Sequence, residues 1–334
     1  MKGKKLAATA LLGFLCIALL GCAADKKRLT GNKLKGWKPK GPVTFIIPSN
    51  PGGGHDTAGR VFAKAIQDNT GIKLNVVNNA TGGGTVAFAE LMKSKPNGMT
   101  IGQMGLGLTT DQYTVPDCEY TPDSYRYIGI PTGDNIHLVV STKGKFKDMS
   151  LKQFLEYCKT HEVSTACSGT WGQSDTSRYL IEKVAGIKFR RVGIKGGAKC
   201  ALAVISGDVD SALVFPAEIA SQVKAGNLKI LGQLGTKRNH FFPDVPTFKE
   251  LGYDINVPSF KVIALPKDTP DEIYNGWVEI FKLTLANPET AKAYEKVNVE
   301  PMNLVGDEAY QYVMKTHNFM KKIIDTGVMK QKFK

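Results

Sequence analysis

The amino-acid sequence predicts an α/β protein of two domains. Strand-like and helix-like segments alternate through most of its 334 residues, a pattern typical of parallel sheets covered by helices on both faces. About 295 residues follow an N-terminal leader and linker, which is natural for two domains rather than one core. Glycine-rich loops join several strands to the helices that follow them. The edges of the predicted sheets are therefore where we expect a ligand.

The N-terminus has the pattern of an export signal. Residues 1–5 contain three lysines, and residues 6–20 form an apolar run that is too short and wrongly flanked for a membrane-spanning helix. The run ends in LLGC, which resembles the lipobox of bacterial lipoproteins, whose cysteine becomes lipid-modified after cleavage. We interpret residues 1–22 as a lipoprotein signal peptide with lipidation at Cys22, and residues 23–40 as a flexible tether. An ordinary signal peptide with an incidental cysteine is the alternative.

The charge and the cysteines limit the classes of partner. Without the leader, 41 basic and 30 acidic residues give a net charge of +11. Since nucleic acid is not an expected partner of an exported protein, this field favours anionic small molecules or membrane surfaces; a merely solvated basic surface is the alternative. The cysteines past Cys22 are irregularly spaced, so no metal site is expected. One disulfide among the last three, or free thiols throughout, both fit the four cysteines, which are Cys118, Cys158, Cys167 and Cys200.

The first part of the fold begins with a β-rich run at residues 43–47. Apolar residues then recur at helical spacing, at Ala58, Val61, Phe62, Ala65 and Ile66. The same order of strand and helix repeats at residues 74–77 and 85–93. Residues 99–104 supply a third strand.

The second part begins with a strand at residues 136–141 and a helix that Ser150 and Gln153 open as a capping box. Another helix over 217–225 ends at Gly226, an expected stop. The remaining predicted strands are 163–167, 189–192, 211–215, 228–234 and 260–265. The remaining predicted helices are 271–285, 288–297 and 307–324.

Three loops carry few large side chains between a strand and a helix. They read PSNPGGGHD after the first strand, NNATGGGT after the second and SGTWGQSD after the strand at 163–167. Free N–H groups and the helix dipole at a helix start form an anion site, and glycine lets an anion reach them. A tight connection without a ligand is the alternative for any one loop. Three such loops in a basic exported chain favour an anion-binding cleft.

Enzymatic motifs fit the sequence poorly. There is no GxxxxGK[ST], since Ala198 precedes Lys199 in GIKGGAKCA, and no GxGxxG followed by a ribose-binding acid. There is no GxSxG nucleophile elbow, and the five histidines show neither HExxH nor metal-ligand spacing. We therefore expect no catalytic residues, no metal and no cofactor.

A succession of motifs resembles a known family. PGGGHDTAGR at 51–60 resembles PGGxxDxxxR, and VNNATGGGT at 77–85 followed by PNGMT resembles V-E-N-x-x-G-A-G-G followed by P-D-G-Y-T. VGIKGGAKCA at 192–201 resembles V-P-Y-K-G-G-x-x-A, and the segment at 235–253 resembles K-R…P-D-V-P-T…E-x-G-Y. These motifs are those of the solute-binding proteins of tripartite tricarboxylate transporters, also called Bug-type receptors. The chain departs from them at Asn78, Thr85, Gly193 and Ile194.

The resemblance implies a two-lobed periplasmic binding protein, a type II-like Venus-flytrap with two α/β domains and a hinge. Lobe I would be residues 41–140 plus 260–334, and lobe II residues 141–259. Such a receptor captures a mono-, di- or tricarboxylate or related anion and delivers it to membrane permease subunits. It would be a periplasmic monomer that is not an enzyme and that touches the membrane only through lipidated Cys22. A sensor-kinase receptor of the same fold is the alternative, and an exported hydrolase is less favoured.

The resemblance also implies which residues line the cleft. Gly53 and Gly83 would lie close to the anion, whereas Asp56 would hold its loop by accepting backbone N–H bonds, since a carboxylate repels another anion. Trp171 would either contact the ligand at the cleft mouth or, as the alternative, cover the inter-lobe surface or pack into its own domain. The full set of candidate ligand-binding residues is Ser49, Asn50, Gly52, Gly53, Asp56, Gly83, Gly84, Thr85, Gly105, Ser168, Thr170, Trp171, Ser174 and Phe215.

Overall fold

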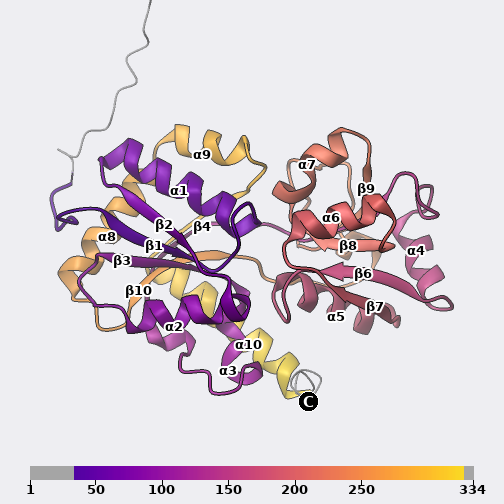
Figure 1. The fold of residues 1–334 in the computed structure, drawn as a ribbon, viewed down its shortest axis with the longest axis horizontal. Coiled ribbons are helices and arrows are strands. Elements are labelled where there is room, and N and C mark those ends of the chain that lie inside the picture. Colours follow the sequence, from indigo (N-terminus) through magenta and orange to yellow (C-terminus); the bar gives the residue numbers. More distant parts are fainter. Residues whose placement is uncertain (1–33, 327–334) are drawn as a thin grey trace, which may run out of the picture.

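The computed structural model describes residues 34–326, which form two lobes, each with its own sheet (Figure 1). The predicted two-lobed α/β class is confirmed. In the part described, the sheet of lobe I has the strand order β11-β4-β10-β3-β1-β2, and that of lobe II has the order β7-β6-β8-β5-β9. The strands of lobe I are β1 (Val43–Ile47), β2 (Leu74–Asn78), β3 (Thr100–Met104), β4 (Tyr125–Thr132), β10 (Lys261–Pro266) and β11 (Pro301–Val305). Those of lobe II are β5 (His137–Ser141), β6 (Val163–Cys167), β7 (Phe189–Gly193), β8 (Ser211–Val214) and β9 (Leu228–Gln233).

Helices cover both sheets. Those of lobe I are α1 (Gly54–Thr70), α2 (Thr85–Lys93), α3 (Asp111–Thr114), α8 (Asp271–Leu285), α9 (Pro288–Glu295) and α10 (Asp307–Asp325). Those of lobe II are α4 (Leu151–Cys158), α5 (Gln173–Ala185), α6 (Gly197–Ser206) and α7 (Pro216–Lys224). Short 3-10 turns are η2 (Thr81–Gly84), η3 (Leu106–Thr109), η4 (Pro122–Ser124) and η5 (Lys249–Leu251).

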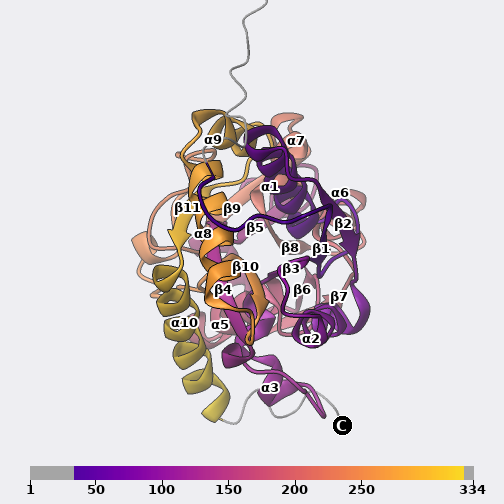
Figure 2. The same cartoon turned by 90° about the vertical axis from the view of Figure 1, so that its left-hand side faces the viewer.

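Alternation along the strands of lobe I decides which helix covers which face. Phe45 and Ile47 of β1 lie in a cluster with Phe62 of α1 and Phe281 of α8, whereas Ile46 lies in the cluster on the other face with residues of α2 and α10. Successive side chains of a strand point to opposite faces, so β1 serves both. Figures 1 and 2 show α1 and α9 on one side of this sheet and α2 and α10 on the other. Each large apolar side chain buried in this way contributes about 1.5–3 kcal/mol.

Both sheets are mixed, which corrects the expectation of parallel sheets. Strands β1, β2 and β3 run parallel in lobe I, and β6, β7 and β8 run parallel in lobe II. Strands β10 and β11 are antiparallel to β4, and β5 is antiparallel to β8 and β9. Neither β4 nor β11 was among the predicted strands. Because β4 lies between β10 and β11, it supplies an inner strand of the first sheet.

The chain passes between the sheets through residues 133–136 and 234–260. Strand β5 belongs to the second sheet, so residues 137–140 go with lobe II rather than with lobe I, where the sequence analysis put them. The residues at 136–141 predict a strand, but a local pattern does not decide which sheet that strand joins. The chain returns to the first sheet at β10.

The predicted tether is too long at its C-terminal end. Trp37 packs against the cluster that contains Trp277, and the centroids of the two indole rings are 6.4 Å apart. The backbone N–H groups of Lys35 and Gly36 donate to the Glu279 carboxylate, both at 3.3 Å. Residues 34–40 are therefore docked on lobe I, because the Trp37 side chain packs against Trp277 of α8.

The remaining expectations concern the cysteines, a metal site and the signal peptide. Cys118, Cys158, Cys167 and Cys200 are free thiols, so no disulfide joins cysteines of the described region. Within residues 34–326 no group of His, Cys, Asp and Glu side chains could hold a metal ion, and no helix is long and apolar enough to cross a membrane. The signal peptide with Cys22 lies outside the described residues.

Candidate ligand-binding site

The lobes meet where their parallel strands end. The carboxyl ends of β1, β2 and β3 share one edge of the first sheet, and those of β6, β7 and β8 share one edge of the second. The start of α1, which follows β1, contacts the start of α7, which follows β8: the N–H of Gly54 donates to the Glu218 carboxylate at 3.3 Å. These two sheet edges therefore face each other, and such edges are where open α/β sheets bind ligands.

Helices at this edge begin without a side-chain cap. The residues that precede α1, α2, α5 and α6 are all glycines, and none of them makes a cap hydrogen bond. By contrast, α4 follows the antiparallel strand β5, and the Ser150 side chain at its start accepts from the N–H of Gln153. A helix start without a cap leaves N–H groups for an external acceptor. The four glycines are Gly53, Gly84, Gly172 and Gly196.

Asp56 holds the β1–α1 loop. Its carboxylate accepts hydrogen bonds from the N–H of Gly52 at 2.8 Å, from Nε of Arg60 at 2.9 Å and from Nδ2 of Asn78 at 2.8 Å. Burial acts to raise the pKa of this carboxyl, but these hydrogen bonds outweigh it and lower the pKa below its ordinary value. Asn78 also donates to the Ser49 carbonyl at 3.0 Å. An acid at position 78 could donate neither bond when ionised.

The β2–α2 loop needs its glycines for two reasons. Gly82, Gly83 and Gly84 have φ values of +64°, +76° and +104°, a region that side chains disfavour. A Cβ at Gly84 would also lie 2.9 Å from Cβ of Pro48, so this loop packs directly on the β1–α1 loop. Around Gly83, however, there is open space, with no atom within 4 Å of an ideal Cβ. The Thr85 hydroxyl donates to the Gly82 carbonyl at 3.2 Å.

The β6–α5 loop of lobe II is held in the same way. Asp175 accepts from the N–H of Trp171 at 3.1 Å and from Nε of Arg178 and of Arg191, both at 2.9 Å. The buried Ser174 hydroxyl donates to the Leu213 carbonyl at 2.6 Å and accepts from the N–H of Ser168 at 3.3 Å. Ser174 thus uses its proton within the protein. Its neighbour Thr170 is exposed.

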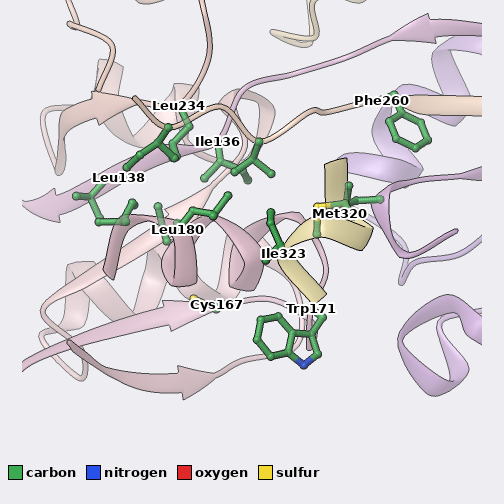
Figure 3. Close-up of a cluster of buried hydrophobic side chains, with 14 of the residues drawn as sticks. Ile136, Leu138, Cys167, Trp171, Leu180, Leu234, Phe260, Met320 and Ile323 are labelled. Atoms are coloured by element: carbon green, nitrogen blue, oxygen red, sulfur yellow. The ribbon is translucent and has the colours of Figure 1, made fainter. Parts of the chain in front are cut away.

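Trp171 turns into the protein. It is 8% exposed, has φ of +56° and packs edge-on against Tyr179, with ring centroids 6.0 Å apart. Figure 3 draws it in the same buried cluster as Met320 and Ile323 of α10, which belong to the other lobe. The structure thus gives the indole the inter-lobe packing that was the alternative expectation. A ligand contact by Trp171 remains a prediction.

A buried ion pair lies in the segments that connect the lobes. Nζ of Lys261, the first residue of β10, is 2.6 Å from the Asp134 carboxylate, and each side chain is 2% exposed. Asp134 also accepts from the N–H of Glu300 at 2.7 Å. The Lys261 ammonium lies 5.0 Å from the centroid of the Phe215 ring. This pair was not predicted, since nothing in the sequence relates residues so far apart.

His55 and Gln103 form a second polar contact, close enough to Lys261 to feel its charge. Nδ1 of His55 is 3.1 Å from Oε1 of Gln103, and a Cβ at Gly105 would lie 2.7 Å from the His55 ring. The close approach of this ring is one reason for glycine at 105. Burial, helped by the Lys261 charge, lowers the pKa of His55 to about 4, so the imidazole is neutral near pH 7. Among the described residues, Nε2 of Gln103 and Oγ of Ser49 have no hydrogen-bond partner.

Phe215 and Glu218 bring lobe II onto the start of α1. An ideal Cβ at Gly54 would lie 3.2 Å from the Phe215 ring and 3.7 Å from the Glu218 carboxylate. Phe215 was predicted, whereas Glu218 was missed. A signal for it exists, because proline in the first turn and a glutamate at the third helical position mark a helix start. Residues of lobe II therefore lie against the β1–α1 loop.

Two cavities lie elsewhere. One of about 340 Å³ is formed by the connecting segments, with Asn135, Arg238 and Glu300 in its wall. Another of about 230 Å³ lies beside the end of α2, at Met92 and Lys267. Neither is lined by the glycine loops, so the candidate site rests on the strand ends and helix starts.

Comparison with known proteins agrees with this geometry. Residues 58–328 match the model of the tripartite tricarboxylate transporter family receptor. The chain belongs to this family. The receptor is 29% identical to protein BugT of Bordetella pertussis over 241 residues, which are 70% of this chain and 73% of BugT. It is 28% identical over 312 residues to a Cupriavidus necator protein named UPF0065 protein in gbd 5'region, covering 92% and 93% of the two chains.

Solved structures share the fold of the receptor. The periplasmic binding protein BugD is 23% identical, with a TM-score of 0.76 and coverage of 85% of this chain and 98% of BugD. MatC from Rhodopseudomonas palustris, solved with bound malate, is 20% identical, with a TM-score of 0.78 and coverage of 86% and 100%. An R. palustris protein solved with adipate is 18% identical, with a TM-score of 0.78 and coverage of 86% and 97%.

Proposed function

We propose that this receptor binds a small organic carboxylate between its lobes and delivers it to the membrane permease subunits of a tripartite tricarboxylate transporter. The observation that carries the proposal is the pair of glycine-rich starts of α2 and α5, which lie at the facing edges of the two sheets and have no side-chain cap. Their N–H groups suit a carboxylate, which accepts several hydrogen bonds. Relatives with malate and adipate support the same ligand class.

The carboxylate would enter where backbone is accessible. Gly52 and Gly83 in lobe I and Gly169 in lobe II have no atom within 4 Å of an ideal Cβ. Ser49, whose hydroxyl lacks a partner among the described residues, would add a side-chain contact. Asp56 and Asp175 would support the loops without touching the anion, because each already holds an arginine.

The setting of this function is also part of the proposal. Members of the family such as BugD are periplasmic binding proteins. We place this chain in the periplasm as a monomer without catalytic activity, anchored through lipidated Cys22. The anchor would keep the receptor near its permease, and two or more acyl chains would make that attachment stable.

A ligand screen tests the proposal. Thermal unfolding of the receptor is measured with mono-, di- and tricarboxylates and their amide and amino derivatives, and each hit is confirmed by calorimetry. A ligand at 100 times its dissociation constant stabilises by about 2.7 kcal/mol. If no organic acid in such a panel binds, the proposed function is wrong.

A pair of glycine variants locates the site. Gly83→Val is expected to weaken binding at least tenfold, because its side chain would fill open space at the start of α2. Gly186→Val is the matched control: Gly186 has a similar φ of +66° and open surroundings, but it lies at the C-terminal end of α5. Equal affinity in both variants would place the ligand away from the β2–α2 loop.

A further inference from the structure

The Glu218 carboxylate lies where helix starts from both lobes meet. It accepts a hydrogen bond from the N–H of Gly54 in α1 at 3.3 Å and one from the N–H of Phe215, which precedes α7, at 2.9 Å. The backbone N–H of Gly197, at the start of α6, also acts to lower the pKa of this carboxyl. A side chain of the protein therefore occupies backbone donors of the kind that a ligand carboxylate would use.

The neighbouring glycines are shaped to this carboxylate. A Cβ at Gly197 would overlap the carboxylate of Glu218, and a Cβ at Gly54 would crowd Phe215 and Glu218. Both glycines are the first residues of regular helices, and neither has a positive φ. Their backbones do not require glycine, so the close approach of Glu218 and Phe215 explains the residue type. The contact is built into both lobes.

Among residues 34–326, no basic side chain forms a salt bridge with Glu218, and the charges nearby have other partners. Lys261 is paired with Asp134, and in the loops Arg60 is paired with Asp56 and Arg191 with Asp175. Burial raises the pKa of the Glu218 carboxyl, opposed by its backbone donors and by the charge of Lys261. A second carboxylate placed beside Glu218 would meet a like charge in a poorly solvated site.

A nitrogen donor fits the same place. Each carboxylate oxygen can accept two hydrogen bonds, so Glu218 keeps free acceptor positions after its backbone bonds. An ammonium group would also balance its charge. The other end of the ligand, a carboxylate, would still bind the glycine loops around Gly52 and Gly83, where backbone is open.

We propose that Glu218 determines specificity by accepting a hydrogen bond from an ammonium or amide group of the ligand. The receptor then prefers acids with one carboxylate and one nitrogen donor over dicarboxylates of equal length. This inference rests on the proposed function, because it assumes that an organic acid binds between the lobes. It separates this chain from the relatives solved with malate and adipate, which are dicarboxylates.

Acids matched in length test the proposal. Calorimetry on the full chain compares succinate with 4-aminobutanoate and succinamate, and adipate with 6-aminohexanoate and adipamate. The wild type is expected to bind the better nitrogen-bearing member of a series at least tenfold more tightly than the diacid. Glu218→Gln keeps the shape but removes the charge, and it should reduce the preference for the ammonium ligand at least tenfold.

Glu182→Gln is the matched control variant. Glu182 is also a partly buried glutamate of lobe II, bonded to Arg178 and to the N–H of Phe189, both of the same lobe. It should leave the ratio of affinities unchanged. Circular dichroism establishes that both variants fold, and the wild-type ratio tests the proposal independently of either.

Three results would overturn the inference. One is a diacid that binds the wild type as tightly as its nitrogen-bearing partners, and another is a ratio that Glu218→Gln does not change. The third is that no acid of either series binds while another organic acid does, which leaves the proposed function standing. If no organic acid binds at all, the proposed function fails and the inference fails with it.

Discussion

The buried ion pair between Asp134 and Lys261 gives the sharpest stability prediction. Each side chain is 2% exposed, and the charged atoms are 2.6 Å apart. Asp134→Asn keeps an oxygen for the N–H of Glu300 but leaves the Lys261 ammonium buried without its counter-charge. Breaking a buried pair from one side costs about 3–5 kcal/mol. For a folded part of this size that corresponds to a fall in Tm of roughly 5–8 °C.

A double-mutant cycle separates the pair from its surroundings. Lys261→Met should also destabilise, because it leaves the Asp134 carboxylate buried and unpaired. The double variant removes both charges, so it should be more stable than the sum of the single losses predicts, by about 2 kcal/mol or more. Urea unfolding followed by circular dichroism measures all four proteins. A loss below about 1 kcal/mol for Asp134→Asn, or additive losses, would refute this account of the ion pair.

Three further predictions follow from the fold. Burial lowers the pKa of the fully buried His137 to about 4, against 6.5 when unfolded. The contribution of the neutral imidazole to stability is therefore complete above pH 6.5 and is lost as the pH falls towards 4. His137→Gln should flatten this part of the profile of stability against pH, and an unchanged profile would contradict the assignment. Trp37→Ala should destabilise by about 1–2 kcal/mol and expose residues 34–40 to protease, whereas equal cleavage of wild type and variant would show that this segment is not docked. Cys22→Ser should release the protein from the membrane fraction on cell fractionation, and a wild type already found free of that fraction would rule out the lipid anchor.

Local signals made much of the fold predictable. The apolar spacing from Ala58 to Ile66 lies on the buried side of α1, and the predicted capping box of Ser150 and Gln153 is present. Such features depend on residues close in sequence, so a single chain reveals them. The glycine loops were predictable for the same reason, because a strand, a glycine run and a helix follow one another directly.

Other features depend on pairing between distant segments. Strand β5 was predicted as a strand, but its hydrogen bonds to β8 and β9 decide that it belongs to lobe II. The docking of Trp37 depends on a site formed by α8. In both cases the local pattern is satisfied equally well by more than one arrangement, and the partner strand or helix selects among them.

The sequence by itself determined the α/β class, the glycine loops and the motifs of a receptor family, since these are written in short runs of residues. Only the tertiary structure decided what those loops face. It sets the Glu218 carboxylate against Gly54 and Gly197, and it pairs Lys261 with Asp134 across 127 positions of sequence. Charges and close contacts act through space and not along the chain. The charges and donors of the inter-lobe site therefore come from residues that meet only when both lobes are folded and in contact.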